Sequence, residues 1–226
     1  MKIGILQAGH SPDALKDDWG DYGSFFEKML GERGFDTAVY SVVDMEFPQG
    51  VQDCDGWLIT GSRHGTYDDL PFIPLLEEFI RSAFAAAVPM VGVCFGHQII
   101  AQALGGKVEK FAGGWAVGRT EYDMGGETVA LNAWHQDQVT AIPDGAEVCA
   151  SNDFCKYAAL VYDTRAFTVQ PHPEFEPGFV KGLAETRGRG VVPDPLLDAA
   201  IDNTDRPVDN AAFAQRIARF FKERKL

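Results

Sequence analysis

The segment that most constrains the fold is residues 91–106, VGVCFGHQIIAQALGG. It begins as an apolar run, turns between Gly92 and Gly96, and continues with apolar residues at helical spacing until the glycine pair at 105–106. A small residue two positions before and two after a nucleophile is typical of a nucleophile elbow, a sharp strand-to-helix turn, here centred on Cys94. Backbone passes close to the nucleophile in such a turn, so glycine is needed at both flanking positions.

The elbow also indicates chemistry. A cysteine at a helix N-terminus lies near free N–H groups and the positive end of the helix dipole, which favour the thiolate over the thiol. The alternative is a buried cysteine in an ordinary strand–turn–helix, whose glycines serve only the turn. The pentapeptide alone does not decide between them. The rest of the chain has to supply a base and an oxyanion site.

In the first half of the chain, segments with strand patterns alternate with segments with helix patterns, as in an α/β protein. Its apolar patterns predict strands at 2–7, 35–43, 56–60 and 90–93, and helices at 22–33 and 72–87. This order predicts a mostly parallel sheet with helices on both faces. Ligands in such sheets bind beyond the carboxyl ends of the strands, where the loops 8–10 and 61–69 and Cys94 are expected. Segment 9–21 is expected to be a polar loop.

After residue 107 the pattern changes to short extended segments. A glycine pair, Gly125-Gly126, between 121–123 and 128–131 predicts a hairpin, and hence a small antiparallel β-section. Further elements are expected as strands at 147–150, 158–162 and 166–170, and as helices at 177–186 and 210–225 with a Gly/Pro/Asp-rich connection. No segment has the composition of an interdomain linker, so we expect residues 1–226 to form one domain.

Composition excludes several classes of protein. A net charge of −13 offers no basic stripe for nucleic acid. The longest apolar stretch, 83–96, contains Pro89 and is too short to span a bilayer, and the N-terminus does not read as a signal peptide. The four cysteines show no spacing typical of a zinc site or a redox pair. We therefore expect a cytoplasmic protein with reduced thiols and without a membrane or nucleic-acid partner.

A base for Cys94 is predicted in the segment QPHPE at 170–174. Pro171 ends the preceding strand, and the residue before a proline avoids helical backbone, so His172 should be extended. Residues two apart in extended chain point to the same side, which places Glu174 to accept a hydrogen bond from the His172 ring. That is the geometry of a Cys–His–Glu triad. The alternative is a turn with both side chains in solvent.

An oxyanion site is predicted beside the elbow. The N–H of Phe95 opens the expected helix, and the loop GSRHG at 61–65 leaves the third strand at the same end of the sheet. The alternative is a glycine-rich turn that binds nothing. A phosphate cradle fits less well, because the loop has neither the spacing nor the Gly-Lys-Ser/Thr ending of a P-loop.

Five segments together resemble the class I glutamine amidotransferase family across residues 56–175. They are LITGS at 58–62, GVCFGHQ at 92–98, LGG at 104–106, WHQDQV at 134–139 and QPHPE at 170–174. The resemblance implies a flavodoxin-like fold and hydrolysis of a γ-glutamyl amide, usually the side chain of glutamine. It implies no metal and no organic cofactor.

The resemblance also implies roles for individual residues. Cys94 would carry a γ-glutamyl thioester, His172 would act as base and acid, and Glu174 would orient the imidazole. Gly61 and Phe95 would supply the oxyanion N–H groups.

The same resemblance implies roles for three further residues. Gln98 would help to hold the glutamyl substrate. His97 would pack beneath the elbow, and His135 would lie with Asp137 on a loop near the pocket mouth.

The sequence departs from the family pattern in one loop, where Gly-Ser-Arg at 61–63 replaces the usual Gly-Gly-Pro. Segment 111–118, FAGGWAVG, is similar to stand-alone relatives that include γ-glutamyl peptidases. The first hypothesis is therefore a stand-alone γ-glutamyl amide hydrolase, and the second a glutaminase subunit that delivers ammonia to a separate synthetase. A binding protein that has lost catalysis and a different cysteine hydrolase are further alternatives. The leaving group stays open, as does a homodimer formed through helix 210–225.

Overall fold

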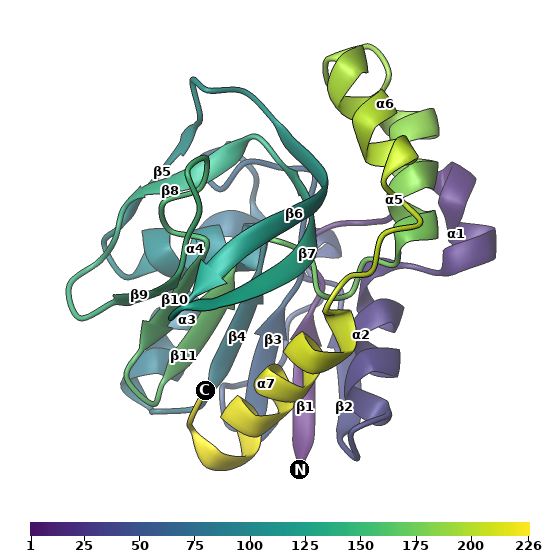
Figure 1. Ribbon diagram of the computed structural model, residues 1–226. Coiled ribbons are helices and arrows are strands. Elements are labelled where there is room, and N and C mark those ends of the chain that lie inside the picture. Colours follow the sequence, from purple (N-terminus) through teal and green to yellow (C-terminus); the bar gives the residue numbers. More distant parts are fainter.

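The computed structural model describes all residues, 1–226, around a seven-stranded sheet of order β2-β1-β3-β4-β11-β10-β9 (Figure 1). Its strands are β1 (Lys2–Leu6), β2 (Asp36–Tyr40), β3 (Gly56–Ile59), β4 (Met90–Val93), β9 (Glu147–Ala150), β10 (Ala159–Tyr162) and β11 (Ala166–Val169). The run from β2 to β11 is parallel, and β10 and β9 extend the sheet antiparallel. The predicted mixed, mostly parallel sheet is confirmed.

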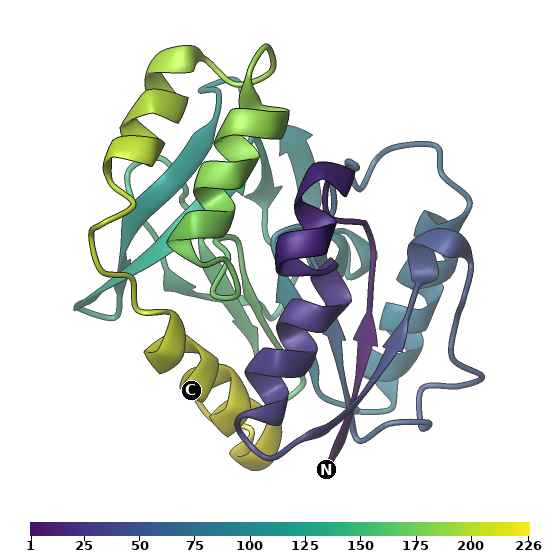
Figure 2. The same cartoon turned by 90° about the vertical axis from the view of Figure 1, so that its right-hand side faces the viewer.

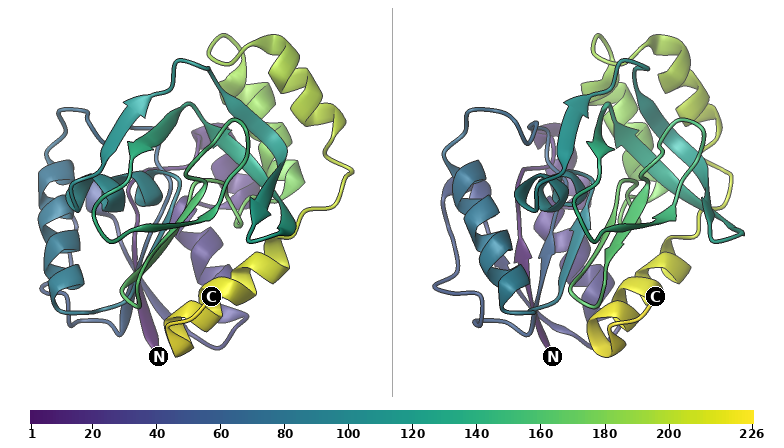
Figure 3. Two further views of the ribbon diagram at one scale, coloured as in Figure 1. Left: turned by 60° about the vertical axis from the view of Figure 1, so that its left-hand side comes forward. Right: turned by 90° about the vertical axis from the view of Figure 1, so that its left-hand side faces the viewer.

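Helices cover both faces of the sheet, because successive strand side chains point to opposite sides. They are α2 (Tyr22–Gly31) and α7 (Asn210–Glu223) on one face, and α3 (Phe72–Ala85) and α4 (Phe95–Ala103) on the other (Figure 3). Ile5 packs into the first core and its neighbour Leu6 into the second. The arrangement is the doubly covered sheet that the flavodoxin-like prediction requires.

The C-terminal helix α7 completes the core. Its apolar stripe, Phe213, Ile217, Phe220 and Phe221, is buried against the sheet. The alternative use of this stripe, to cover a second subunit, is therefore not available to these side chains.

A small antiparallel section stands beside the main sheet. It consists of the hairpin β6 (Ala116–Met124) and β7 (Glu127–His135), and of β5 (Lys107–Lys110) paired with β8 (Asp137–Ala141). The hairpin turns at Gly125-Gly126, where both glycines have positive φ. The predicted hairpin is confirmed, although its strands extend well beyond 121–123 and 128–131.

Three helical segments differ from the prediction. The expected loop 9–21 contains α1 (Asp13–Trp19), and the expected connection to the last helix contains α6 (Asp194–Asp202). The helix predicted at 177–186 is α5 (Pro177–Leu183), which continues as a π-helix at Ala184–Gly188. Short helices owe their stability to packing rather than to propensity, and α1 buries only Leu15, so their sequence signal is weak.

The unit α5–α6 packs over the β6–β7 hairpin and beside α1 (Figure 2). Its buried Val192 and Leu197 contact Trp115 and Trp134 of the antiparallel section. These two layers form one wall of the site described below. None of the helices combines the length and the apolarity needed to cross a bilayer, and the four cysteines form no disulfide.

Candidate active site

Cys94 lies at the joint between β4 and α4 in a strained backbone conformation, with φ 52° and ψ −103°. A Cβ on Gly92 would lie 2.4 Å from the carbonyl oxygen of Gly96, and a Cβ on Gly96 would lie 2.2 Å from the carbonyl oxygen of Ile59. No side chain fits at either position. The turn therefore requires both glycines, as the pattern predicts, and holds the cysteine in a conformation that L-residues rarely adopt.

The two residues predicted to supply oxyanion N–H groups, Phe95 and Gly61, lie close to Cys94. Phe95 is the first residue of α4, so its N–H has no acceptor within the helix. Gly61 follows β3, and a Cβ there would lie 3.8 Å from Cβ of Cys94 and 3.0 Å from Cε1 of His172. The structure thus brings the predicted oxyanion loop, the elbow and the histidine segment to one place.

His172 and Glu174 form a buried pair. Nδ1 of His172 lies 2.7 Å from Oε1 of Glu174, and both side chains are less than 5 % exposed. His172 is held by a hydrogen bond from its N–H to the carbonyl of Asn132 on β7, and the chain then turns at residues 173–174, where the Phe175 N–H donates to the carbonyl of His172. The expectation of extended backbone is wrong at residues 173–174, which form a turn, and the alternative of a turn with both side chains in solvent is wrong as well, because both side chains are buried.

The charge state of His172 is set by its neighbours. Burial by itself would lower the pKa of the imidazole, but the Glu174 carboxylate and then Cys94 raise this pKa to about 10. Nε2 makes no well-formed hydrogen bond, so Cys94 acts on it chiefly as a nearby charge. Such bonds are often loose in an enzyme without substrate. At neutral pH the ring is therefore a cation facing Cys94.

A cavity of about 410 Å³ opens in front of Cys94. Its lining comes from the loop after β3, the β7–β8 connection, the end of β5, and the segment around α5 and α6. The polar members are Ser62, Arg63, His64, Asp68, Lys110, Gln136, Asp137 and Arg187, and the large apolar ones are Tyr67, Trp115, Trp134, Val191 and Val192.

Gln98 also lines this cavity, one helical turn beyond Cys94. Its Nε2 donates hydrogen bonds to the carbonyl of Asp137 at 2.8 Å and to Oε1 of Gln170 at 3.0 Å. Its amide nitrogen is therefore engaged by protein, which leaves only Oε1 to meet a ligand.

The other two histidines of the predicted motifs are buried and uncharged. Nδ1 of His97 lies 2.8 Å from Oγ1 of Thr168 beneath the elbow, and burial lowers the pKa of His97 to about 3. His135 ends β7 at the cavity, and burial lowers its pKa to about 3 as well. Asp137 accepts a hydrogen bond from the Tyr67 hydroxyl at the cavity mouth.

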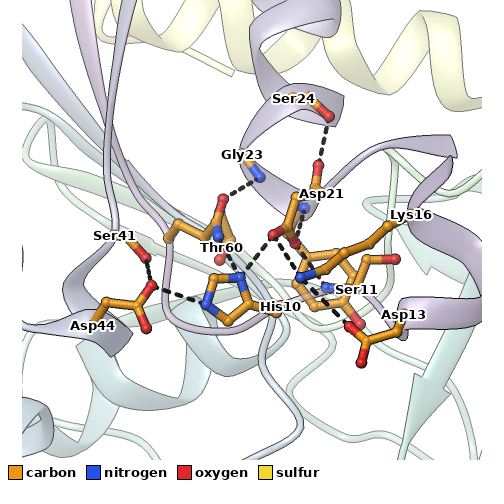
Figure 4. Close-up of polar contacts among 12 residues, drawn as sticks. His10, Ser11, Asp13, Lys16, Asp21, Gly23, Ser24, Ser41, Asp44 and Thr60 are labelled. Atoms are coloured by element: carbon orange, nitrogen blue, oxygen red, sulfur yellow. Dashed lines mark hydrogen bonds and ion pairs between the residues drawn. The ribbon is translucent and has the colours of Figure 1, made fainter.

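The loop 8–10 does not contribute to the cavity, although it lies at the carboxyl end of β1. Nδ1 of His10 is 2.7 Å from Oδ2 of Asp21, and its Nε2 is 2.9 Å from Oδ2 of Asp44 (Figure 4). Asp21 also accepts the backbone N–H groups of Ser11 and Tyr22 and so caps α2. The expectation that this loop takes part in ligand binding is wrong, since its polar groups are used to anchor α2.

Sequence reasoning missed the wall made by the C-terminal half. Arg187 enters the cavity from the π-helix, which inserts an extra residue into the turn and is frequent at functional sites. No pattern near Arg187 relates it to Cys94, because the two meet only through the packing of α5–α6 on the hairpin. Trp134 lies in the segment whose His135 and Asp137 were expected near the pocket mouth, but no role was predicted for Trp134 itself.

Comparison with known proteins places the chain in a family. Residues 18–181 match the glutamine amidotransferase class-I family. A glutamine amidotransferase-like protein of Schizosaccharomyces pombe is 28 % identical over 98 % of both chains. Gamma-glutamyl peptidase 3 of Arabidopsis thaliana is 28 % identical and covers 77 % of each chain.

The fold is also that of solved relatives. The crystal structure of a glutamine amidotransferase from Methylobacillus flagellatus matches 99 % of this chain and 92 % of its own, with a TM-score of 0.78 and 23 % identity. The resemblance inferred from the elbow and the QPHPE segment is confirmed. The chain belongs to the glutamine amidotransferase class-I family.

Proposed function

We propose that this protein hydrolyses γ-glutamyl amide bonds through a thioester on Cys94. The observation that carries the proposal is the buried His172–Glu174 pair, held beside a strained cysteine at the N-terminus of α4. Membership of a glutamine amidotransferase family and the likeness to a gamma-glutamyl peptidase support the γ-glutamyl group as the acyl part.

The first half of the reaction forms the thioester. The Cys94 thiolate attacks the γ-carbonyl carbon, and the oxygen that becomes negative accepts hydrogen bonds from the N–H groups of Gly61 and Phe95. The C–N bond then breaks while the His172 imidazolium gives its proton to the leaving nitrogen. Ammonia or an amine departs, and the glutamyl group stays on sulfur.

The second half releases glutamate. His172, now neutral, takes a proton from water as the water oxygen attacks the thioester carbon. The C–S bond breaks, and Cys94 returns to a thiolate beside a protonated His172. Glu174 stays ionised throughout and holds Nδ1–H, so that Nε2 faces the reacting atoms in both steps.

A labelling experiment tests the nucleophile. One molecule of a glutamine-like electrophile should attach to Cys94 and abolish glutamate release, and the Cys94→Ala variant should not be labelled. Burial raises the pKa of the Cys149 and Cys155 thiols to about 12, so both are protonated at neutral pH and serve as internal controls. Labelling of Cys149, Cys155 or Cys54 in place of Cys94 would contradict the proposal.

The second enzymatic hypothesis, a glutaminase subunit for a synthetase, is separated by the choice of substrate. The hydrolase should release glutamate by itself from glutamine or from γ-glutamyl peptides. Negligible release by the protein alone, restored by a partner synthetase, would favour the subunit.

A further inference from the structure

We propose that Arg187 binds a carboxylate of the leaving group, so that the substrates are γ-glutamyl amino acids or peptides with a free carboxylate. This inference rests on the proposed function and names the substrate class of the same site. It assigns a binding role to a residue outside the motifs discussed above.

The first observation is that Arg187 has no partner in the protein. Every arginine outside the cavity donates at least one hydrogen bond from its guanidinium to a carboxylate, a carbonyl or a side-chain amide oxygen. Arg63 and Arg187 donate none, and both line the cavity in front of Cys94. In a chain with a net charge of −13, carboxylates are plentiful, so two unpaired arginines in one cavity indicate a site for an anion.

Arg187 is also the better placed of the two. Arg63 is exposed, whereas Arg187 is half-buried and is projected by the π-helix, whose neighbours Ala184 and Gly188 are buried. Burial, and after it the charges of Arg63 and Arg187, lower the pKa of His64, which also lines the cavity. A guanidinium held in this way can grip a carboxylate with two parallel hydrogen bonds.

The anions of the cavity do not compete for Arg187. Asp137 accepts the Tyr67 hydroxyl, and Asp68 accepts the N–H of Gly65 with His64 3.9 Å away. Lys110, a third cation of the lining, forms no ion pair either. The cavity therefore presents unpaired positive charge to whatever enters it.

The size of the cavity indicates that the carboxylate bound by Arg187 belongs to the leaving group and not to the glutamyl part of the substrate. A volume of about 410 Å³ lies within the range of about 300–1,000 Å³ that ligand sites of drug-like size have. Free glutamine has only ammonia to place beyond the scissile bond. The apolar wall of Trp115, Trp134 and Val192 offers contact to an amino-acid side chain next to the carboxylate.

The test compares γ-glutamylglycine with γ-glutamylglycinamide, which have the same shape except that a neutral amide replaces the carboxylate. The wild-type protein should favour the carboxylate form in kcat/KM. Arg187→Gln should lower this preference about 10- to 100-fold, mainly through KM, because hydrogen bonds to a charged group are lost. Arg187→Lys should have a preference between those of the wild type and Arg187→Gln, since lysine keeps the charge but cannot donate two parallel hydrogen bonds.

Two further variants distinguish the loss of a substrate contact from misfolding. Arg187→Glu should reverse the preference toward γ-glutamylethylenediamine, whose leaving group carries an ammonium, and such a gain cannot come from a damaged fold. Arg189→Gln is the matched control, because Arg189 is exposed, lies outside the cavity and pairs with Asp194 and Asp198. It should leave the preference unchanged.

Two results would overturn the assignment. An equal loss on both glycine substrates in Arg187→Gln would place the guanidinium on the glutamyl part, and an unchanged preference would remove Arg187 from binding altogether. Failure of the proposed function has a different signature, because no γ-glutamyl substrate would then yield glutamate with the wild-type protein.

Discussion

The imidazole of His172 lies flat on the phenyl ring of Phe175, with centroids 3.9 Å apart and planes inclined by 2°. The carbonyl of Phe175 accepts hydrogen bonds from the side-chain amides of Asn132 at 2.8 Å and Asn210 at 2.9 Å. The ring of His172 is thus fixed by a stack on one side and by Glu174 at its edge. The segment that carries it is bound to β7 and to α7.

Phe175→Leu should impair catalysis more than binding. The substitution keeps apolar volume but removes the flat surface, so the imidazole gains freedom to tilt away from Cys94. We expect kcat to fall about 10-fold or more with KM little changed, because small misplacements of a reacting group are costly. Phe179→Leu, in the same aromatic cluster but without the stack, is the control for lost stability. Equal kcat in the two variants would contradict a positioning role for Phe175.

Glu174→Gln should change the pH profile of kcat/KM. In the wild type the Glu174 carboxylate and Cys94 outweigh burial and raise the pKa of His172 to about 10, so activity that needs the imidazolium falls only as pH passes through about 10. Removing the carboxylate lets burial lower this pKa, and the alkaline limb should move to lower pH. A limb that stays in place would show that Glu174 does not set the charge of His172.

The same pair also makes stability depend on pH. Because the folded pKa of His172 lies above the ordinary value of 6.5, its contribution is fully present below 6.5 and is lost as pH rises through about 10. The free energy of unfolding of the wild type should therefore decline toward that of Glu174→Gln over this range. Urea denaturation at a series of pH values measures the difference.

Asp21→Ala should destabilise the fold, since Asp21 caps α2 and holds His10. Loss of a helix cap costs about 0.5–2 kcal/mol, and the ion pair with half-exposed His10 adds little. Although burial raises the pKa of Asp21, hydrogen bonds from Ser11, His10 and Tyr22 lower it below 3.8 overall. The stability that Asp21 contributes is thus present above 3.8 and is lost as pH falls through the lowered pKa. Asp17→Ala, an exposed change on α1, should cost almost nothing at any pH.

The parts of the site that follow from the sequence are those fixed by local geometry. Gly92 is demanded by a backbone contact within the strand–turn–helix, and the short separation of His172 and Glu174 in the chain keeps their side chains together, although a turn and not extended chain joins them. The same kind of argument failed for His10. Its position after β1 is local, but Asp44, which helps to hold it away from the cavity, comes from a different part of the chain.

The same distinction, between local sequence and packing of distant segments, separates the helices and strands that could be predicted from those that could not. The central strands β3 and β4 are continuous buried runs and could be predicted, as could α3 and α7 with their apolar stripes. Helix α1 buries only Leu15, and α6 buries only Leu197 and Ala200, so neither shows a clear apolar stripe. Arg187 lies beyond prediction as well, because its entry into the cavity depends on a π-helix and on how α5–α6 packs over the hairpin.

The elbow itself gives the sharpest test of the glycine pattern. In Gly96→Ala the new Cβ would lie 2.2 Å from the carbonyl oxygen of Ile59, which is backbone in the middle of the sheet and has no room to retreat. We expect a loss of about 1–3 kcal/mol or more from overpacking and no labelling of Cys94 by a glutamine-like electrophile, because α4 has to move. Gly31→Ala is the matched change, since a Cβ at that helical position meets nothing within 4 Å. It should be neutral or stabilising by about 0.5–1 kcal/mol and leave labelling intact. Normal labelling in Gly96→Ala would mean that the turn tolerates a side chain and that the glycine pattern is not what holds the cysteine in place.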